Sequence, residues 1–132
     1  YYNDSIGTSP ASTIAGLNAF DENIVLLAGG SDKGLDYKEI GEKIAQKVGT
    51  LILTGPTSEK IENATVIALG EMQDKKIDII HCTNLEEAVK MAKQKAVTGD
   101  VVLLSPASAS FDAFKNFEER GKKFKQYVNE LN

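Results

Sequence analysis

The sequence predicts an α/β fold, a Rossmann-like and mostly parallel sheet flanked by helices on both faces. Apolar runs typical of buried strands alternate with segments of helical spacing along all 132 residues. The runs from Ile24 onward are also continuously apolar, as in strands whose two faces are both covered. Right-handed crossovers between parallel strands then give a Rossmann-like sheet, in which ligands bind beyond the carboxyl ends of the strands.

The chain begins with Tyr1-Tyr2, which reads as the end of a strand. A polar turn over Asn3–Pro10 follows and leads into a short helix that ends near Phe20. Ser9 suits the N-cap of that helix, and Pro10 suits its first position because proline has no N–H to leave unbonded.

A second strand is predicted at 24–28 and is followed by a glycine-rich loop at 29–34. The next helix ends near Gly49, a candidate C-cap. Its apolar positions at helical spacing are Tyr37, Ile40, Ile44 and Val48.

Two more helices follow further strands. Thr57-Ser58 can cap a helix that reaches about Gly70. Asn84 with Glu87 forms a near capping box at the start of a helix that continues to about Val97. The remaining strands are predicted at 51–54, 77–82 and 101–104.

The last strand runs into a serine-lined turn, where Ser105-Pro106 ends the strand because proline cannot donate to a ladder. Ser110 is the expected N-cap of the final helix, and Asp112 suits its positive end. The apolar positions of that helix are Phe114, Phe117, Phe124, Val128 and Leu131. A strand that leads through serines to a helix N-terminus is a ready anion site, although an ordinary capped connection has the same local chemistry.

Composition excludes several function classes. A formal net charge of −4 gives no basic face for nucleic acid or an anionic membrane, and no apolar run approaches the length of a membrane span. No segment has the pattern of a signal peptide. The single Cys82 excludes an internal disulfide, and its neighbour His81 has no further residue nearby to complete a metal site. We expect a cytoplasmic protein without a metal centre.

Two further loops at the predicted binding edge contain polar side chains. Lys33 in the loop Gly29–Gly34 is a point positive charge suited to a carboxylate or phosphate, although the loop is not a P-loop and contains no GxGxxG. Asp4 could hydrogen-bond a ribose, and Thr8 could hold a carboxylate. Taken singly, each loop also reads as a plain turn with a solvated lysine or a local Asx hydrogen bond.

Three motifs carry a resemblance to a known family. LLSPASASFDAFKNFEERG resembles the pattern LLSPACASFDxFxNFExRG of the Mur ligases that add D-glutamate, with Ser108 where the family often has cysteine. NDSIGTSP and AGGSDKGLDY resemble NDSKATNP and AGGxDKGxDF in the same order, with Ile6 and Ser9 in place of lysine and asparagine. The DNPR signature of siblings that add diamino acids is absent, as is the histidine-containing turn of folate-polyglutamylating relatives. The resemblance covers essentially the full chain.

The resemblance implies that residues 1–132 are a single domain, the C-terminal amino-acid-binding domain of a three-domain ligase in peptidoglycan precursor synthesis. In that reaction ATP phosphorylates the alanine carboxylate of UDP-N-acetylmuramoyl-L-alanine, and the D-glutamate amine attacks the acyl phosphate. ATP and Mg²⁺ serve the full-length enzyme, whose central domain carries the P-loop, the magnesium ligands and a carbamylated lysine. The domain alone is expected to bind no cofactor and to be inactive.

The resemblance also assigns site residues. Those matched to D-glutamate are Thr8, Lys33, Ser110, Phe111 and Phe117, the last two through their backbone. Asp4 matches a residue that touches the ATP nucleoside, and no residue of this domain is implied as catalytic or as a metal ligand. Two alternatives stay open from the residues themselves, a stand-alone Rossmann-like module that binds a nucleotide or anion without turnover, and an interaction domain whose loops are only turns.

Overall fold

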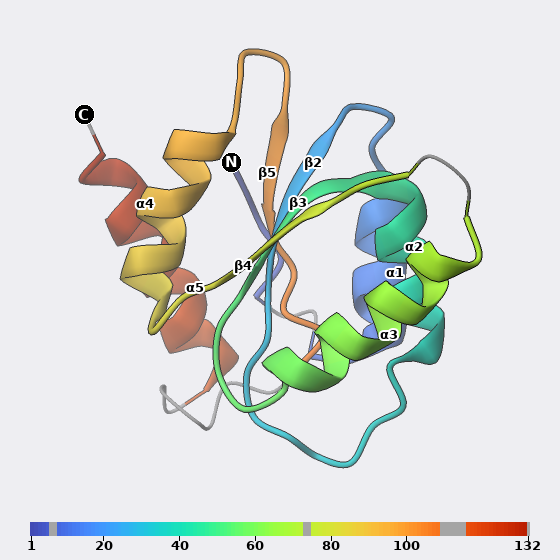
Figure 1. Ribbon diagram of the computed structural model, residues 1–132. Helices are drawn as coiled ribbons and strands as arrows, with labels where there is room; N and C mark the ends of the chain where they lie inside the picture. The colour runs from blue at the N-terminus through green and yellow to red at the C-terminus, as the bar shows by residue number, and fades with distance from the viewer. Residues whose placement is uncertain (6–7, 73–74, 109–115, 132) are drawn as a thin grey trace.

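The computed structural model describes residues 1–5, 8–72, 75–108 and 116–131, which contain a five-stranded parallel sheet in the order β1-β5-β2-β3-β4 (Figure 1). The strands are β1 Tyr2–Asn3, β2 Ile24–Ala28, β3 Val48–Leu53, β4 Asp78–His81 and β5 Val101–Leu104. The helices are α1 Pro10–Asn18, α2 Lys38–Lys47, α3 Ser58–Gly70, α4 Leu85–Lys95 and α5 Phe117–Asn129. The predicted alternation of strands and helices is confirmed.

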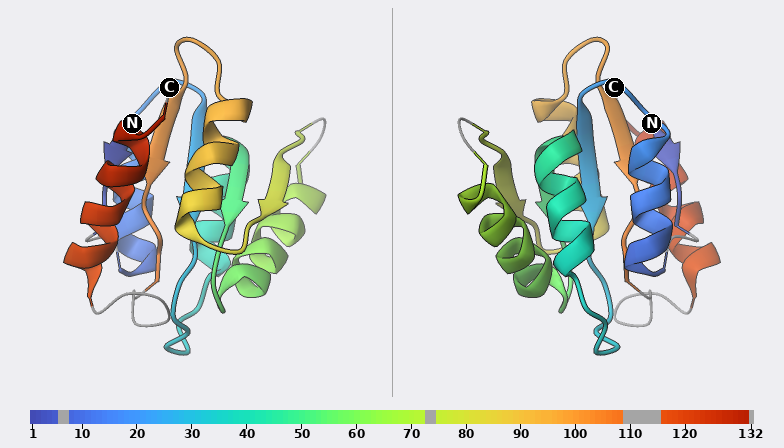
Figure 2. Two further views of the ribbon diagram at one scale, coloured as in Figure 1. Left: turned by 90° about the vertical axis from the view of Figure 1, so that its left-hand side faces the viewer. Right: turned by 90° about the vertical axis from the view of Figure 1, so that its right-hand side faces the viewer.

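The helices divide between the two faces of the sheet. Figure 2 shows α1, α2 and α3 on one face and α4 and α5 on the other. Alternate residues of β2 serve the two sides, since Leu26 belongs to one apolar cluster and Val25 to the other. All five residues of β2 are buried, as the continuous apolar run predicts.

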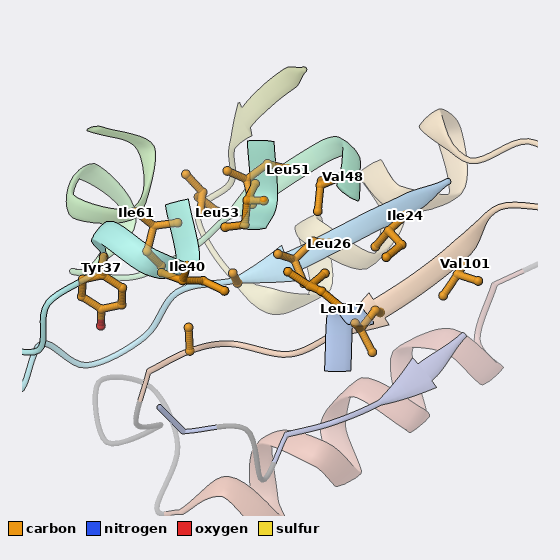
Figure 3. Close-up of a cluster of buried hydrophobic side chains, with 14 residues drawn as sticks. Leu17, Ile24, Leu26, Tyr37, Ile40, Val48, Leu51, Leu53, Ile61 and Val101 are labelled. Carbon is orange, nitrogen blue, oxygen red and sulfur yellow. The ribbon is translucent and has the colours of Figure 1, made fainter. Parts of the chain in front are cut away.

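The larger cluster lies between the sheet and the helices α1 to α3 (Figure 3). Leu17 of α1, Ile40 of α2 and Ile61 of α3 are fully buried against Leu26 of the central strand. Burial of one such side chain contributes about 1.5–3 kcal/mol, so this cluster is a principal source of stability. Tyr37 lies at its margin, and its hydroxyl points away from Ile61 in Figure 3.

Two predicted helix caps are confirmed. The Ser12 amide donates to Ser9 Oγ at 3.3 Å at the start of α1, where Pro10 is the first helical residue. The Glu87 amide donates to Asn84 Oδ1 at 2.9 Å at the start of α4. Each bond satisfies one of the amides that a helix N-terminus leaves unpaired.

The prediction that Gly49 ends α2 as its C-cap is wrong, because Val48 and Gly49 already belong to β3. Val48 has extended backbone angles, φ −101° and ψ 136°, and is paired with Ile24. Glycine is needed at position 49 for space, since a Cβ there would lie 2.2 Å from Asn23 Oδ1. A glycine after a helical pattern thus marks a close approach in the next strand.

The prediction that Ser110 caps the last helix is also wrong. The helix α5 begins at Phe117, and its N-cap Asn116 accepts the Glu119 amide at 2.9 Å through Oδ1. Asparagine offers the same acceptor chemistry as serine, and it stands directly before the helix. The positions Ser110, Phe111, Asp112 and Phe114 lie outside the described residues.

We expect Gly41→Ala to destabilise the protein, by about 1–3 kcal/mol, because α2 and α3 pack closely at this glycine. A Cβ at position 41 would lie 2.5 Å from the carbonyl carbon of Ala64, and backbone cannot give way as a flexible side chain does. Gly70→Ala is the matched control in a helix, since its Cβ would meet nothing within 4 Å. Urea denaturation should show a lower free energy of unfolding for the first variant alone; equal values for both would contradict close packing at Gly41.

Candidate functional site

The position of β5 in the sheet indicates the edge at which a ligand would bind. It lies between β1 and β2 and is parallel to both. The chain leaves β1 and β2 for the face that carries α1 to α3, but it leaves β5 for the face that carries α5 (Figure 2). In open α/β sheets, ligands bind beyond the carboxyl ends of the strands at such a reversal. The loops after β1, β2 and β5 therefore form the candidate site.

Asp4 directly follows β1 and is bound to the neighbouring strand end. Its amide donates to the Leu104 carbonyl at 2.7 Å, and its Oδ2 accepts the Ser105 hydroxyl at 2.6 Å. The Ser105 hydroxyl also lies 3.0 Å from Thr13 Oγ1 of α1. A carboxylate offers about four acceptor positions, so Asp4 keeps capacity for a further donor. The loop after β1 is thus held in place with a half-buried carboxylate at the carboxyl edge of the sheet.

The glycine-rich loop after β2 is fixed at its first residue. Gly29 has φ 109°, and a Cβ there would lie 1.9 Å from the Thr54 carbonyl oxygen, so only glycine fits. Its amide donates to the Pro106 carbonyl at 2.9 Å, which joins this loop to the one after β5.

Lys33 stands in a tight turn within that loop. The Gly34 amide donates to Asp32 Oδ1 at 2.8 Å, and Lys60 of α3 lies 2.9 Å from Asp32 Oδ2. The hydrogen bond from Lys60, with the Gly34 amide second, holds the pKa of Asp32 below its ordinary value. The exposed Lys33 is therefore displayed on a turn that is tied to α3.

Arg120 of α5 joins three segments of chain. Its guanidinium donates to Ser5 Oγ at 3.1 Å, to the Ser5 carbonyl at 2.8 Å and to the Ser108 carbonyl at 3.0 Å. Ser5 Oγ in turn donates to the Phe117 carbonyl at 2.6 Å. Arg120 is 4% exposed, and its fork geometry suits several oxygens held at fixed angles. The loops after β1 and β5 are thereby attached to the start of α5.

Three buried hydroxyls join the glycine-rich loop to the loop after β5. Ser108 Oγ lies 2.9 Å from Thr57 Oγ1 and 3.1 Å from the Tyr37 hydroxyl. Thr57 Oγ1 also accepts the Gly30 amide at 3.0 Å. Thr57 stands at the N-cap position of α3, as predicted, but its side chain makes no cap bond because its hydroxyl serves this cluster instead.

The structure places the described site candidates at this one edge of the sheet. Asp4 and Thr8 follow β1, Lys33 follows β2, and Phe117 opens α5, which lies beyond β5. The Ser5–Phe117 bond brings the start of α5 to the loop after β1. Ser110 and Phe111 are not among the residues that the structure describes.

Sequence reasoning missed the residues that hold these loops together, above all Arg120. One signal was present, because Arg120 is the only arginine in a chain whose other cationic side chains are all lysines. Arginine is the cation preferred for fixed hydrogen-bonded contacts in buried positions. The roles of Ser5, Thr57 and Ser108 had no such signal, since serine and threonine are common in turns.

The other titratable groups do not form a reactive centre in the part of the chain that is described. No group of three or more His, Cys, Asp or Glu there could hold a metal ion. His81 Nε2 lies 3.0 Å from Glu62 Oε1 at the exposed edge of the sheet. Partial burial, and secondarily Glu87, raises the pKa of the Cys82 thiol, which therefore stays protonated at neutral pH.

A membrane-spanning segment was searched for in the same described residues. None of their helices is both long enough and apolar enough to cross a bilayer.

The sequence is similar to those of known proteins. Residues 1–108 match the family described as "Mur ligase, glutamate ligase domain". The chain is 54% identical over 134 residues to the UDP-N-acetylmuramoylalanine–D-glutamate ligase of Acetivibrio thermocellus, and 50% identical over 131 residues to that of Clostridium acetobutylicum. Each alignment covers 99% of this chain and 28% of the relative, so the chain spans less than a third of the relatives' length.

The fold has a counterpart among solved structures. A murein peptide ligase from Psychrobacter arcticus superposes with a TM-score of 0.58 over 95% of this chain and 26% of that protein. The sequences are 13% identical, so this likeness concerns the fold alone.

We expect Arg120→Lys to lower the free energy of unfolding by about 2–4 kcal/mol. A lysine ammonium cannot reproduce the planar fork, so at least one buried oxygen of Ser5 or Ser108 loses its donor. Lys125→Ala, at an exposed position of the same helix, is the control and should change stability by less than about 0.5 kcal/mol. If the two variants unfolded at the same urea concentration, Arg120 would not be the clamp described above.

We expect iodoacetamide to alkylate Cys82 with a pH midpoint above that of the unfolded chain, because burial and Glu87 raise the thiol pKa. Glu87→Gln leaves the burial in place and removes the carboxylate, so it should lower the midpoint. An unchanged midpoint in that variant would show that burial alone sets the pKa of Cys82. Rates are measured by mass spectrometry across alkaline pH.

Proposed function

This chain belongs to the Mur ligase family through its glutamate ligase domain, and we propose that it is the C-terminal, amino-acid-binding domain of a longer ligase that adds D-glutamate to UDP-N-acetylmuramoyl-L-alanine. The proposal follows the names of relatives that are 54% and 50% identical over almost the whole chain. Residues 1–132 are then one domain of three. As part of cell-wall precursor synthesis, the ligase would act in the cytoplasm.

The observation that supports the proposal most is the convergence of polar loops on the two sides of β5. The loop with Asp4 follows β1, and the loop with Lys33 follows β2, on either side of the loop that leaves β5. A dicarboxylate such as D-glutamate needs a cation and several hydrogen-bond donors held at a fixed spacing. Lys33 and Thr8 are suited to one carboxylate of D-glutamate.

The second carboxylate of D-glutamate belongs, in this proposal, to Ser110 and to the backbone of Phe111 and Phe117. Phe117 is the first residue of α5, and the opening amides of a helix point outward toward an anion. The Phe117 carbonyl already accepts a hydrogen bond from the Ser5 hydroxyl, so the backbone N–H of Phe117 is the group suited to a ligand.

Asp4 is proposed to touch the nucleoside of ATP. Its Oδ2 bond to Ser105 orients the carboxylate, and the remaining acceptor positions suit a ribose hydroxyl. The described residues offer no cluster for Mg²⁺, so we derive no step from a metal bound by this domain.

The proposed contribution of this domain is positioning. The D-glutamate amine attacks the acyl phosphate of the nucleotide sugar, and the tetrahedral intermediate then loses phosphate. A domain that binds D-glutamate and closes over the nucleotide holds the amine in attack geometry. The other domains of the ligase would supply the phosphate-binding and metal-binding groups.

We expect Lys33→Ala, made in the full-length ligase, to raise the KM for D-glutamate by roughly tenfold to a hundredfold. A hydrogen bond to a charged group contributes about 1.5–3 kcal/mol, which converts to a change of that size. The KM for UDP-N-acetylmuramoyl-L-alanine should change far less, since Lys33 is assigned to the amino acid alone. Both constants come from phosphate-release assays at varied substrate.

Lys38→Ala is the control, because it removes another exposed lysine, at the start of α2. It should leave both constants near those of the wild type. Equal increases in both KM values in Lys33→Ala would give Lys33 a structural role and remove it from the D-glutamate site.

A further inference from the structure

We propose that the buried hydroxyls of Tyr37, Thr57 and Ser108, here called the hydroxyl cluster, are positioning groups. They fix the distance between the loop carrying Lys33 and the start of α5. The inference rests on the proposed binding of D-glutamate between these two places. None of the three hydroxyls is assigned to touch the substrate. They act through the segments that they connect.

The cluster is built as a structural joint. Ser108 and Thr57 are fully buried and Tyr37 is 4% exposed, so their bonds form where competing water is excluded. Ser108 Oγ lies between the other two hydroxyls, at 2.9 Å from Thr57 and 3.1 Å from Tyr37. A buried network in which each member has a partner specifies one arrangement of the segments that meet there.

The two partners of Ser108 hold both ends of the lysine loop. Thr57 Oγ1 accepts the amide of Gly30 at 3.0 Å, three residues before Lys33. Tyr37 stands four residues after Lys33 and directly before α2. The Lys33 turn therefore lies between Gly30 and Tyr37. Both are linked to the Ser108 side chain, Tyr37 directly and Gly30 through Thr57.

Ser108 also leads to the second arm of the site. The Ser108 carbonyl accepts a hydrogen bond from the Arg120 guanidinium at 3.0 Å. Arg120 also donates to the Ser5 hydroxyl, which in turn donates to the Phe117 carbonyl. A continuous path of hydrogen bonds thus runs from the lysine loop through Ser108 to the first residue of α5. Lys33 and Phe117 are the described residues assigned to opposite carboxylates of D-glutamate, so this path sets the spacing that a dicarboxylate must match.

The test uses the full-length ligase with Ser108→Ala, Tyr37→Phe and Thr57→Val. We expect each variant to raise the KM for D-glutamate by about two- to tenfold, as the loss of one or two neutral hydrogen bonds converts to affinity. Ser108→Ala should have a larger effect than Tyr37→Phe, because it removes the central hydroxyl. The KM for UDP-N-acetylmuramoyl-L-alanine should stay near the wild-type value.

Thr65→Val is the matched control for Thr57→Val. Thr65 is equally buried in α3, and its hydroxyl donates within the helix to the Ile61 carbonyl at 2.8 Å. It should lower the melting temperature without changing the ratio of the two KM values. If Thr57→Val and Thr65→Val changed that ratio equally, or if neither did, the cluster would be structural only and the inference would be overturned.

The double variant Tyr37→Phe/Ser108→Ala tests the joint itself. Because the Tyr37 hydroxyl acts through its bond to Ser108 Oγ, the double variant should raise the KM for D-glutamate no more than Ser108→Ala alone. If the increases in the KM for D-glutamate multiplied in the double variant, Tyr37 and Ser108 would act separately and the inference would be overturned. Tyr37→Phe keeps the aromatic ring and is the variant on which the test relies if Ser108→Ala does not fold.

A wild-type ligase that does not use D-glutamate would refute the proposed function. Normal turnover of D-glutamate by variants whose KM is unchanged would refute only this inference.

Discussion

The pairing of β5 between β1 and β2 is the constraint on which the rest of this structure depends. Leu103 is paired with Tyr2 on one side and with Leu26 on the other, so the last strand of the chain is inserted between the first two. All four residues of β5 are buried, and the chain leaves β5 for the face opposite to that taken after β1 and β2. The three polar loops meet at one edge of the sheet for that reason. A strand added at the outer edge of β4 would not have placed its loop between those after β1 and β2.

Hydrogen bonds from side chains turn this adjacency into a fixed geometry. Arg120 joins the loops after β1 and β5 to α5, and the hydroxyl cluster joins the loop after β5 to the glycine-rich loop. Every buried side-chain nitrogen or oxygen of the described residues has a partner, which spares these polar groups the cost of burial without a bond. The loops are thus polar while the atoms that anchor them lie within the protein. Such an arrangement holds the polar groups of these loops in place, and groups that are held before a ligand arrives reduce the ordering cost of binding.

The errors of local prediction have a common cause. The immediate neighbours of Gly49 and Ser110 predict a C-cap and an N-cap. Gly49 instead makes room for Asn23 from an adjacent segment, and the acceptor that begins α5 is Asn116. Thr57 has the sequence of a cap, yet its hydroxyl serves Gly30, twenty-seven residues away along the chain. Glycine, serine and threonine each satisfy several structural needs, and which need applies depends on what the fold brings beside them.

The sequence alone determined the class of the fold, because the order of apolar runs and helical periods requires a covered parallel sheet. It also determined that the polar loops after β1, β2 and β5 share one edge, since all strands of such a sheet point the same way. Strand order, the clamp made by Arg120 and the hydroxyl cluster were decided only by the tertiary structure. Tyr37 and Ser108 show the reason. The quoted family motifs have phenylalanine and cysteine at these two positions, which are seventy-one residues apart in the chain. Neither residue by itself indicates a contact with the other. The pairing of β5 beside β2 brings their hydroxyls to 3.1 Å. Contact between residues so distant in the chain is set by packing rather than by local pattern.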